Sequence, residues 1–292
     1  LRFRQEVQAV PRQAELIVAV GLQQPQGLLP VAGIRLAATH AGIKADPQRD
    51  DLVLVELAED SRLAAVFTRN RFCAAPVLLA REHLRQAASG RRFLLINSGN
   101  ANAGTGEPGL QAARQTCADL AALTGVETHS VLPFSTGVIG EQLPAERIAA
   151  ALPALVQSLA EDGWLAAARG IMTTDTLPKA ASRRIEIDGR PVTITGICKG
   201  SGMIRPDMAT MLAYVATDAL IDREDLQRCL QQAVDPSFNA ITVDGDTSTN
   251  DACVLIATGR SGVAVDAGHP AFNEALQDLL LQLAQAIVRD GE

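Results

Sequence analysis

A glycine-rich stretch that leads into a threonine is the part of this sequence best suited to chemistry. It runs from Lys199 to Ala209, and Thr210 and a strand-like apolar run follow directly. A threonine hydroxyl is a weak nucleophile unless a base lies beside it. Cleavage of the chain before Thr210 would free such a base, the threonine's own α-amino group, whose ordinary pKa is about 7.7–8.0. The local spacing alone favours a plainer interpretation, in which Thr210 only begins a β-strand.

Four loops rich in glycine and small polar residues favour the nucleophile over the plain strand start. They cover residues 97–106, 135–140, 173–176 and 244–251. Turn chemistry explains any one of them, because Gly, Asn, Asp and Ser favour turns. Four such loops in a chain with a cleavable threonine indicate a site whose backbone N–H groups and hydroxyls bind a ligand. We therefore interpret Thr210 as a nucleophile and the rest of the chain as its scaffold and pocket.

Two of these segments supply further candidates. Thr136 and Gly137 suit an oxyanion hole, since a glycine N–H can approach a ligand closely and a hydroxyl can donate beside it. Lys199 precedes the candidate nucleophile in the same stretch, and its ammonium could hold a substrate carboxylate or lower the nucleophile's pKa. A solvated surface lysine is the commoner alternative for Lys199. The four histidines are isolated in the sequence, and no metal site is expected.

A dinucleotide-binding fingerprint, Gly104-Thr-Gly106-Glu-Pro-Gly109, defines an alternative function as a nucleotide-binding protein. The required geometry is a tight turn from strand to helix that begins at the first glycine. Here Asn97 to Ala103 separate the preceding apolar run from that glycine, so the match is weak.

The elements that would position these residues form a mixture of strands and helices. Strands are expected at 31–36, 51–57, 62–67, 92–97, 130–134, 183–187, 191–198, 211–215, 238–243 and 252–258. Helices are expected at 78–88, 110–123, 144–159, 164–172, 222–233 and 270–289. Strands come mostly in pairs with helices grouped between them, which predicts a mixed α/β or α+β fold rather than strict alternation.

Composition narrows the class of protein. The 292 residues are 47% hydrophobic, which is enough for a buried core, and the net charge of −7 with one Trp and one Tyr argues against a nucleic-acid binder. Five scattered cysteines without a CxxC pair indicate thiols in a reducing compartment. No apolar run is long enough for a bilayer, and residues 1–18 lack a secretory signal core. We expect a cytoplasmic protein with no membrane partner, and a leader at 1–18 that is either disordered or foreign to the domain.

Nine blocks, in order, make the chain resemble the ornithine acetyltransferase family, also called arginine biosynthesis bifunctional glutamate N-acetyltransferases, over about residues 33–292. The blocks are Ala41-Gly-Ile-Lys44, Val66-Phe-Thr-Arg-Asn70, Ala74-Ala-Pro-Val77, Asn97-Ser-Gly-Asn-Ala-Asn-Ala103, Ser135-Thr-Gly-Val-Ile-Gly140, Met172-Thr-Thr-Asp-Thr176, Lys199-Gly-Ser-Gly-Met-Ile204, Met208-Ala-Thr-Met-Leu212 and the segment from Ser237 to Asp251.

The resemblance implies an N-terminal-nucleophile-like ornithine acetyltransferase/aminopeptidase fold and a ping-pong transfer of acetyl from N2-acetyl-L-ornithine to L-glutamate, with acetyl-CoA as a second possible donor. It implies self-cleavage between Ala209 and Thr210, an acetyl-Thr210 intermediate, and an oxyanion hole formed by Thr136 and Gly137. Substrate contacts are implied for four residues, Thr173, Lys199, Thr210 and Glu292. No cofactor is implied. A self-cleaving aminopeptidase or amidase of related fold is the alternative enzyme, with water as the acceptor.

The same resemblance divides the chain into parts. Residues 19–209 would form an α chain that carries the oxyanion hole, and residues 210–292 would form the N-terminal portion of a β chain. The two are expected to stay associated, as a heterotetramer of two α and two β chains. Members of the family continue beyond Glu292, so we expect the C-terminal part of the fold to be missing.

Overall fold

The computed structural model describes residues 21–86, 90–205 and 211–291 of the chain. The expected leader and three of the predicted site residues, Ala209, Thr210 and Glu292, lie outside these described residues.

Two β-sheets form the centre of the molecule. The four-stranded sheet has the order β1 (Ile34–Thr39), β2 (Leu52–Leu57), β4 (Arg92–Asn100) and β5 (Val131–Val138). The five-stranded sheet has the order β3 (Arg62–Phe67), β9 (Ala252–Ala257), β8 (Leu212–Thr217), β7 (Arg190–Lys199) and β6 (Lys179–Ile187). Neighbouring strands are antiparallel except for two parallel pairs, β4 with β5 and β8 with β9.

The two sheets pack face to face. Successive residues of a strand point to opposite faces of its sheet, so one strand contributes side chains to two cores. In β8, Leu212 and Tyr214 enter the core between the sheets, whereas Ala213 and Val215 enter the core beneath the helices of the five-stranded sheet. Both faces of the central strands are therefore buried, which explains why they are apolar almost throughout.

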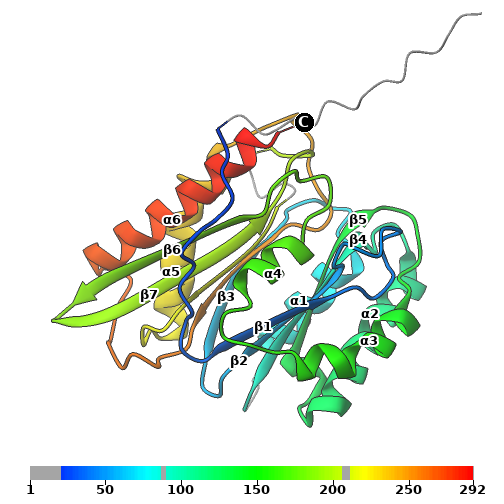
Figure 1. Cartoon of the computed structure of the whole chain (residues 1–292), viewed down its shortest axis with the longest axis horizontal. Coiled ribbons are helices and arrows are strands. Elements are labelled where there is room, and N and C mark those ends of the chain that lie inside the picture. Colours follow the sequence, from blue (N-terminus) through cyan, green and yellow to red (C-terminus); the bar gives the residue numbers. More distant parts are fainter. Residues whose placement is uncertain (1–20, 87–89, 206–210, 292) are drawn as a thin grey trace, which may run out of the picture.

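Helices cover both outer faces, and Figure 1 shows the resulting layers. The helices α5 (Arg223–Val234) and α6 (Pro270–Arg289) lie on the left, and α2 (Gly106–Thr124) and α3 (Ala145–Gln157) lie on the right. Two shorter helices, α1 (Ala75–Arg85) and α4 (Trp164–Gly170), add side chains to the core between the sheets. The mixed α/β fold class predicted from the sequence is confirmed. No helix of the described part is both long and apolar enough to cross a membrane.

One expected strand is wrong. The segment 238–243 contains a short 3-10 turn, Phe238–Ala240, and no strand is formed there in the described chain. The Ser237 hydroxyl donates to the Ala233 carbonyl at 2.6 Å, and Phe238 is buried among the residues beneath α5 and α6. These contacts hold the segment to the end of α5 instead of a sheet edge.

A second difference bears on the candidate site. The strand expected to end at 134 continues to Val138 as β5, so Thr136 and Gly137 lie in a strand and not in a loop. Pairing with β4 continues through a register irregularity at Gly99 and Asn100. Such bulges redirect side chains next to active sites.

Candidate functional site

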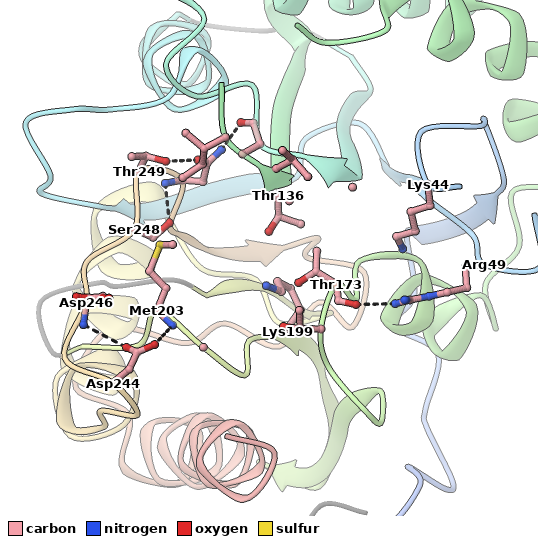
Figure 2. Close-up of a pocket in the computed structure, with 18 residues that line it drawn as sticks. Lys44, Arg49, Thr136, Thr173, Lys199, Met203, Asp244, Asp246, Ser248 and Thr249 are labelled. Atoms are coloured by element: carbon pink, nitrogen blue, oxygen red, sulfur yellow. Dashed lines mark hydrogen bonds between the residues drawn. The ribbon is translucent and has the colours of Figure 1, made fainter. Parts of the chain in front are cut away.

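A cavity of about 530 Å³ lies where β4, β5 and β7 end. All four polar loops singled out in the sequence contribute to its wall, and Figure 2 shows the lining side chains. The structure brings together the four predicted site residues that it describes, Thr136, Gly137, Thr173 and Lys199. The loops therefore form one site, as their shared composition indicated.

The end of β5 is held in place by tight backbone packing and a buried amide. Gly137 has φ of +132°, and a Cβ there would lie 2.3 Å from the carbonyl carbon of Gly99. Only glycine fits this position. The Asn250 side chain donates to the carbonyls of Ala101 and Ser135 at 2.7 and 2.9 Å, which ties β5 to the loop before β9. Thr136 is thus buried in a rigid strand end that faces the cavity.

Lys199, at the end of β7, is 4% exposed and lines the same cavity. No ion pair or hydrogen bond joins its ammonium to another residue in the described ranges. The nearby Asp175 carboxylate is buried behind it and accepts N–H groups from Thr173 at 3.0 Å and Gly200 at 2.7 Å. Burial raises the pKa of Asp175, but the charges of Lys199 and Lys179 outweigh this effect, and the pKa is lowered to about 2. An ionised Asp175 therefore fixes the backbone on both sides of the cavity floor.

Within the motif at 172–176, the structure separates the three threonines. Thr173 and Thr174 line the cavity, and the Thr174 hydroxyl lies 2.6 Å from that of Ser201. Thr176 does not line it and instead hydrogen-bonds through its hydroxyl to the Asp290 carboxylate. The prediction that Thr173 contacts substrate remains a prediction.

The described chain resumes at Met211, immediately after the predicted nucleophile. The Met211 N–H donates to the buried Asp251 carboxylate at 2.9 Å, and the Met211 carbonyl accepts from Ala252. In the sheet register, Leu212 is opposite Lys199. These contacts anchor the start of β8 next to Lys199.

Sequence reasoning missed two cations of the cavity wall, Lys44 and Arg49. Lys44 ends the first block of the family resemblance, Ala41-Gly-Ile-Lys44, but sequence reasoning assigned it no role. A compositional signal was available, because the chain has 26 basic residues but only three lysines, Lys44, Lys179 and Lys199. Two of the three line the cavity, and the third is buried against Asp175. Sequence reasoning also gave no role to Asp244 and Asp246, which line the cavity as well.

The fingerprint Gly104–Gly109 has a packing explanation. Gly109 lies in the first turns of α2, and a Cβ there would lie 1.9 Å from the Thr105 hydroxyl oxygen and 2.4 Å from the Asn102 amide oxygen. The Asn102 amide also donates to the Gly109 carbonyl at 2.9 Å. This close approach accounts for the last glycine of the pattern without a ligand.

Comparison with known proteins decides the family. The model of the ArgJ family matches residues 35–292. The chain belongs to the ArgJ family. It is 61% identical over 269 residues to the arginine biosynthesis bifunctional protein ArgJ of Methylococcus capsulatus, covering 91% of this chain and 65% of that protein. It is 54% identical over 280 residues to ArgJ of Pseudomonas syringae pv. tomato, covering 94% and 68%. The chain thus spans about two thirds of the length of these curated relatives.

Solved structures agree with this membership. ArgJ from Bacillus halodurans is 33% identical, with a TM-score of 0.54 over 62% of this chain and 92% of that chain. Ornithine acetyltransferase from Mycobacterium tuberculosis, solved with ornithine, is 31% identical, with a TM-score of 0.50 over 62% and 93%. An L-aminopeptidase D-Ala-esterase/amidase from Ochrobactrum anthropi, a variant of the Ntn-hydrolase fold, is 11% identical, with a TM-score of 0.50 over 92% and 89%. This last likeness shows the fold alone.

Proposed function

We propose that this ArgJ chain transfers an acetyl group from N2-acetyl-L-ornithine to L-glutamate, with Thr210 as the nucleophile. The observation that supports it most directly is the cavity that joins Thr136, Gly137, Thr173 and Lys199 beside the start of β8. The ArgJ relatives are bifunctional proteins of arginine biosynthesis, and the M. tuberculosis relative is an ornithine acetyltransferase.

The first step is self-cleavage. The Thr210 hydroxyl attacks the Ala209 carbonyl carbon, and the peptide C–N bond breaks, which frees the Thr210 amine and leaves Ala209 as an ester on the threonine oxygen. Water then hydrolyses this ester, which frees the Thr210 hydroxyl and the Ala209 carboxylate. That amine is then the base that activates its own hydroxyl. Its ordinary pKa of about 7.7–8.0 suits a base that works near neutral pH.

Acetyl transfer follows in two halves. In the first, the hydroxyl oxygen attacks the acetyl carbonyl of N-acetylornithine, and ornithine leaves as its amine takes a proton. In the second, the neutral amine of glutamate attacks the acetyl ester and regenerates the threonine. Thr136 and Gly137 donate to the oxyanion of both tetrahedral intermediates, and Lys199 holds the α-carboxylate shared by both amino acids. Ping-pong kinetics follow from the covalent intermediate.

The sheet topology supports lasting association of the proposed α and β chains after cleavage. The β8 strand pairs with β7, and β9 pairs with β3, so the two strands after Ala209–Thr210 lie between strands that precede it in one sheet. Separating them would expose a largely buried core, which is costly. The resemblance to the family, and not this topology, is the ground on which we propose a heterotetramer of two α and two β chains.

The test is Thr210→Ala in the full chain. We expect the purified wild type to give two fragments by intact-mass measurement, with the break at Ala209–Thr210. We expect the variant to remain one piece and to transfer no acetyl group, because it lacks the hydroxyl that both reactions require.

Two outcomes would count against the proposal. Cleavage of the Thr210→Ala chain at the same bond would remove the threonine from the cleavage step. Release of free acetate from N-acetylornithine at the same rate with and without glutamate would instead favour the amidase alternative. Replacement of N-acetylornithine by acetyl-CoA in the same assay tests the second donor.

A further inference from the structure

Lys44 and Arg49 form a cationic wall of the cavity that the proposed mechanism does not use. Figure 2 shows both side chains on the right, and Asp244 and Asp246 on the opposite side. The Arg49 guanidinium donates to the Thr173 carbonyl at 2.8 Å, and the Lys44 ammonium donates to the Asp50 carbonyl at 2.7 Å. Each cation is positioned by a neutral carbonyl, so its positive charge is still available to an anion.

The loop that carries Lys44 is organised by a buried carboxylate. Asp51 is fully buried, and it accepts the N–H groups of Ala41, Ile43 and Lys44 at 2.6, 2.7 and 2.9 Å. Three charge-assisted hydrogen bonds to one carboxylate give a fixed turn. The backbone at Lys44 is therefore fixed by the fold, and the bond from its ammonium to the Asp50 carbonyl sets the direction of the side chain.

Lys44 also lies close to the proposed oxyanion hole. Its Cγ is 3.1 Å from the position that a Cβ on Gly99 would take. Gly99 is in turn paired with Gly137 across the parallel β4–β5 ladder, in backbone contact with it. The Lys44 stem thus packs on the strand that supports the reacting carbonyl, within reach of the rest of a bound amino acid.

The opposite wall has the opposite charge. The Asp244 carboxylate accepts N–H groups from Met203, Ile204 and Asp246. Slight burial raises the pKa of Asp244, but the hydrogen bonds outweigh it, and the net pKa lies below the usual value. The Asp244 carboxylate therefore stays ionised. The cavity therefore has a cationic side and an anionic side with Lys199 and Thr136 between them.

The separated charges of the cavity fit the two proposed substrates, whose side chains carry opposite charges. N-acetylornithine and glutamate share an α-carboxylate and a nitrogen on the same carbon, but their side chains end in an ammonium and a carboxylate. One neutral pocket would serve neither. A pocket with separated charges accepts both, because a flexible side chain can turn to the wall of opposite sign.

We propose that Lys44 and Arg49 form the subsite for the side-chain carboxylate of the acyl acceptor, and so select glutamate in the second half-reaction. This inference rests on the proposed acetyl transfer. The ornithine side chain turns away from this wall, and the donor half-reaction does not need it.

The partial burial of the Lys44 ammonium supports its role as a carboxylate ligand. Burial lowers the pKa of Lys44 to about 8, Arg49 lowers it as well, and Asp51, Asp175 and Asp50 act in the other direction. A partly desolvated ammonium has lost some of its water and gains more from an anionic ligand than a hydrated one.

The test compares three acceptors with wild-type and Lys44→Gln protein, in the full chain with N-acetylornithine as donor. The acceptors are glutamate, glutamine, which lacks the side-chain charge, and isotopically labelled ornithine, which reports exchange. We expect Lys44→Gln to lower kcat/KM for glutamate by about 10- to 100-fold, the usual effect of losing a charge-assisted hydrogen bond. Glutamine use and ornithine exchange should be unchanged.

Matched variants separate charge from structure. Lys44→Arg should keep the preference for glutamate over glutamine. Arg85→Gln removes one positive charge from an exposed position of α1 outside the cavity, and should change nothing. Arg49→Gln gives an independent test at an exposed position and should reduce glutamate use in the same direction.

The outcomes are distinct. An equal loss with all three acceptors, or unchanged glutamate selectivity in both Lys44→Gln and Arg49→Gln, would overturn the inference and leave the proposed function in place. Absence of ornithine exchange in the wild type would overturn the proposed function, and this inference with it.

Discussion

Thr136 and the three lysines are all held in fixed positions in or beside the cavity wall. Thr136 is 7% exposed, yet its side chain reaches the cavity from a strand end. Preorganised donors of this kind are effective because they need no reorganisation when charge develops on the substrate. The lysines follow the same logic, since each is held by carbonyls, carboxylates or packing that fix where its charge lies.

Thr136→Val is the prediction at this scale. The change keeps the side chain's shape and removes only the hydroxyl, so we expect acetyl transfer to slow by about 10²- to 10³-fold, the usual cost of one oxyanion donor. Turnover of N-acetylornithine with glutamate measures it. Thr116→Val is the matched control, because that hydroxyl donates to the Ala113 carbonyl within α2 and does not line the cavity. Normal turnover in Thr136→Val would reject the oxyanion role.

At the scale of elements, a buried ion cluster joins the end of α6 to the cavity floor. The Lys179 ammonium hydrogen-bonds to Asp175 at 2.7 Å and to Asp290, the residue after α6, and all three side chains are fully buried. Burial lowers the pKa of Lys179, but the two carboxylates raise it above its usual value. The helix end therefore supports the same Asp175 that fixes Thr173 and Gly200.

Lys179→Met tests this support. Removing the cation leaves two carboxylates buried without it, and we expect a loss of about 3–5 kcal/mol in the free energy of unfolding at neutral pH. In wild type the charges of Lys199 and Lys179 lower the pKa of Asp175 to about 2, so this stabilisation is lost as the pH falls towards that value, and the deficit of the variant should shrink in the same direction. Urea unfolding at two pH values measures both effects. A deficit that does not depend on pH would indicate lost packing rather than unpaired charge.

Most elements were predictable from sequence, and the two exceptions have separate causes. The α6 helix has the predicted bounds, because its apolar periodicity and its first-turn proline are local signals. The extension of β5 through Thr136 and Gly137 depends on pairing with β4, and the 238–240 turn depends on contacts with α5. The β4 partners are distant in sequence. The Ala233 contact is local, but the apolar residues of 238–243 also favour a strand, and burial of Phe238 beneath α5 and α6 decides against it.

The cavity as a whole shows the same limit at the scale of the molecule. Glycine and small polar residues marked its four loops, residue chemistry indicated Thr136, Gly137 and Lys199, and resemblance to the family added Thr173. The Asp51 carboxylate holds the turn that places Lys44 against Gly99 of β4, and the Thr173 carbonyl holds Arg49 at the same wall. The dipolar arrangement of the walls is therefore a property of the tertiary structure, and no motif in the sequence encodes it.

The last prediction concerns the hydrogen bonds by which Asn250 links the two sheets. Asn250 precedes β9 in the five-stranded sheet, and its amide donates to the carbonyls of Ala101 and Ser135, which belong to the β4–β5 side. Asn250→Ala leaves two buried carbonyls without this donor and should lower the free energy of unfolding by about 1–3 kcal/mol for each unmade hydrogen bond.

Asn250→Asp should be worse at neutral pH, although it is nearly isosteric. The introduced carboxylate would face two carbonyl oxygens, and burial beside them would raise its pKa above the unfolded value. Stability should then recover as the pH falls through that raised pKa, whereas the alanine variant should lack this recovery relative to wild type. Urea unfolding of the three proteins between neutral and acidic pH distinguishes these curves. An aspartate variant as stable as wild type at neutral pH would mean that this amide does not hold the two sheets together at the cavity.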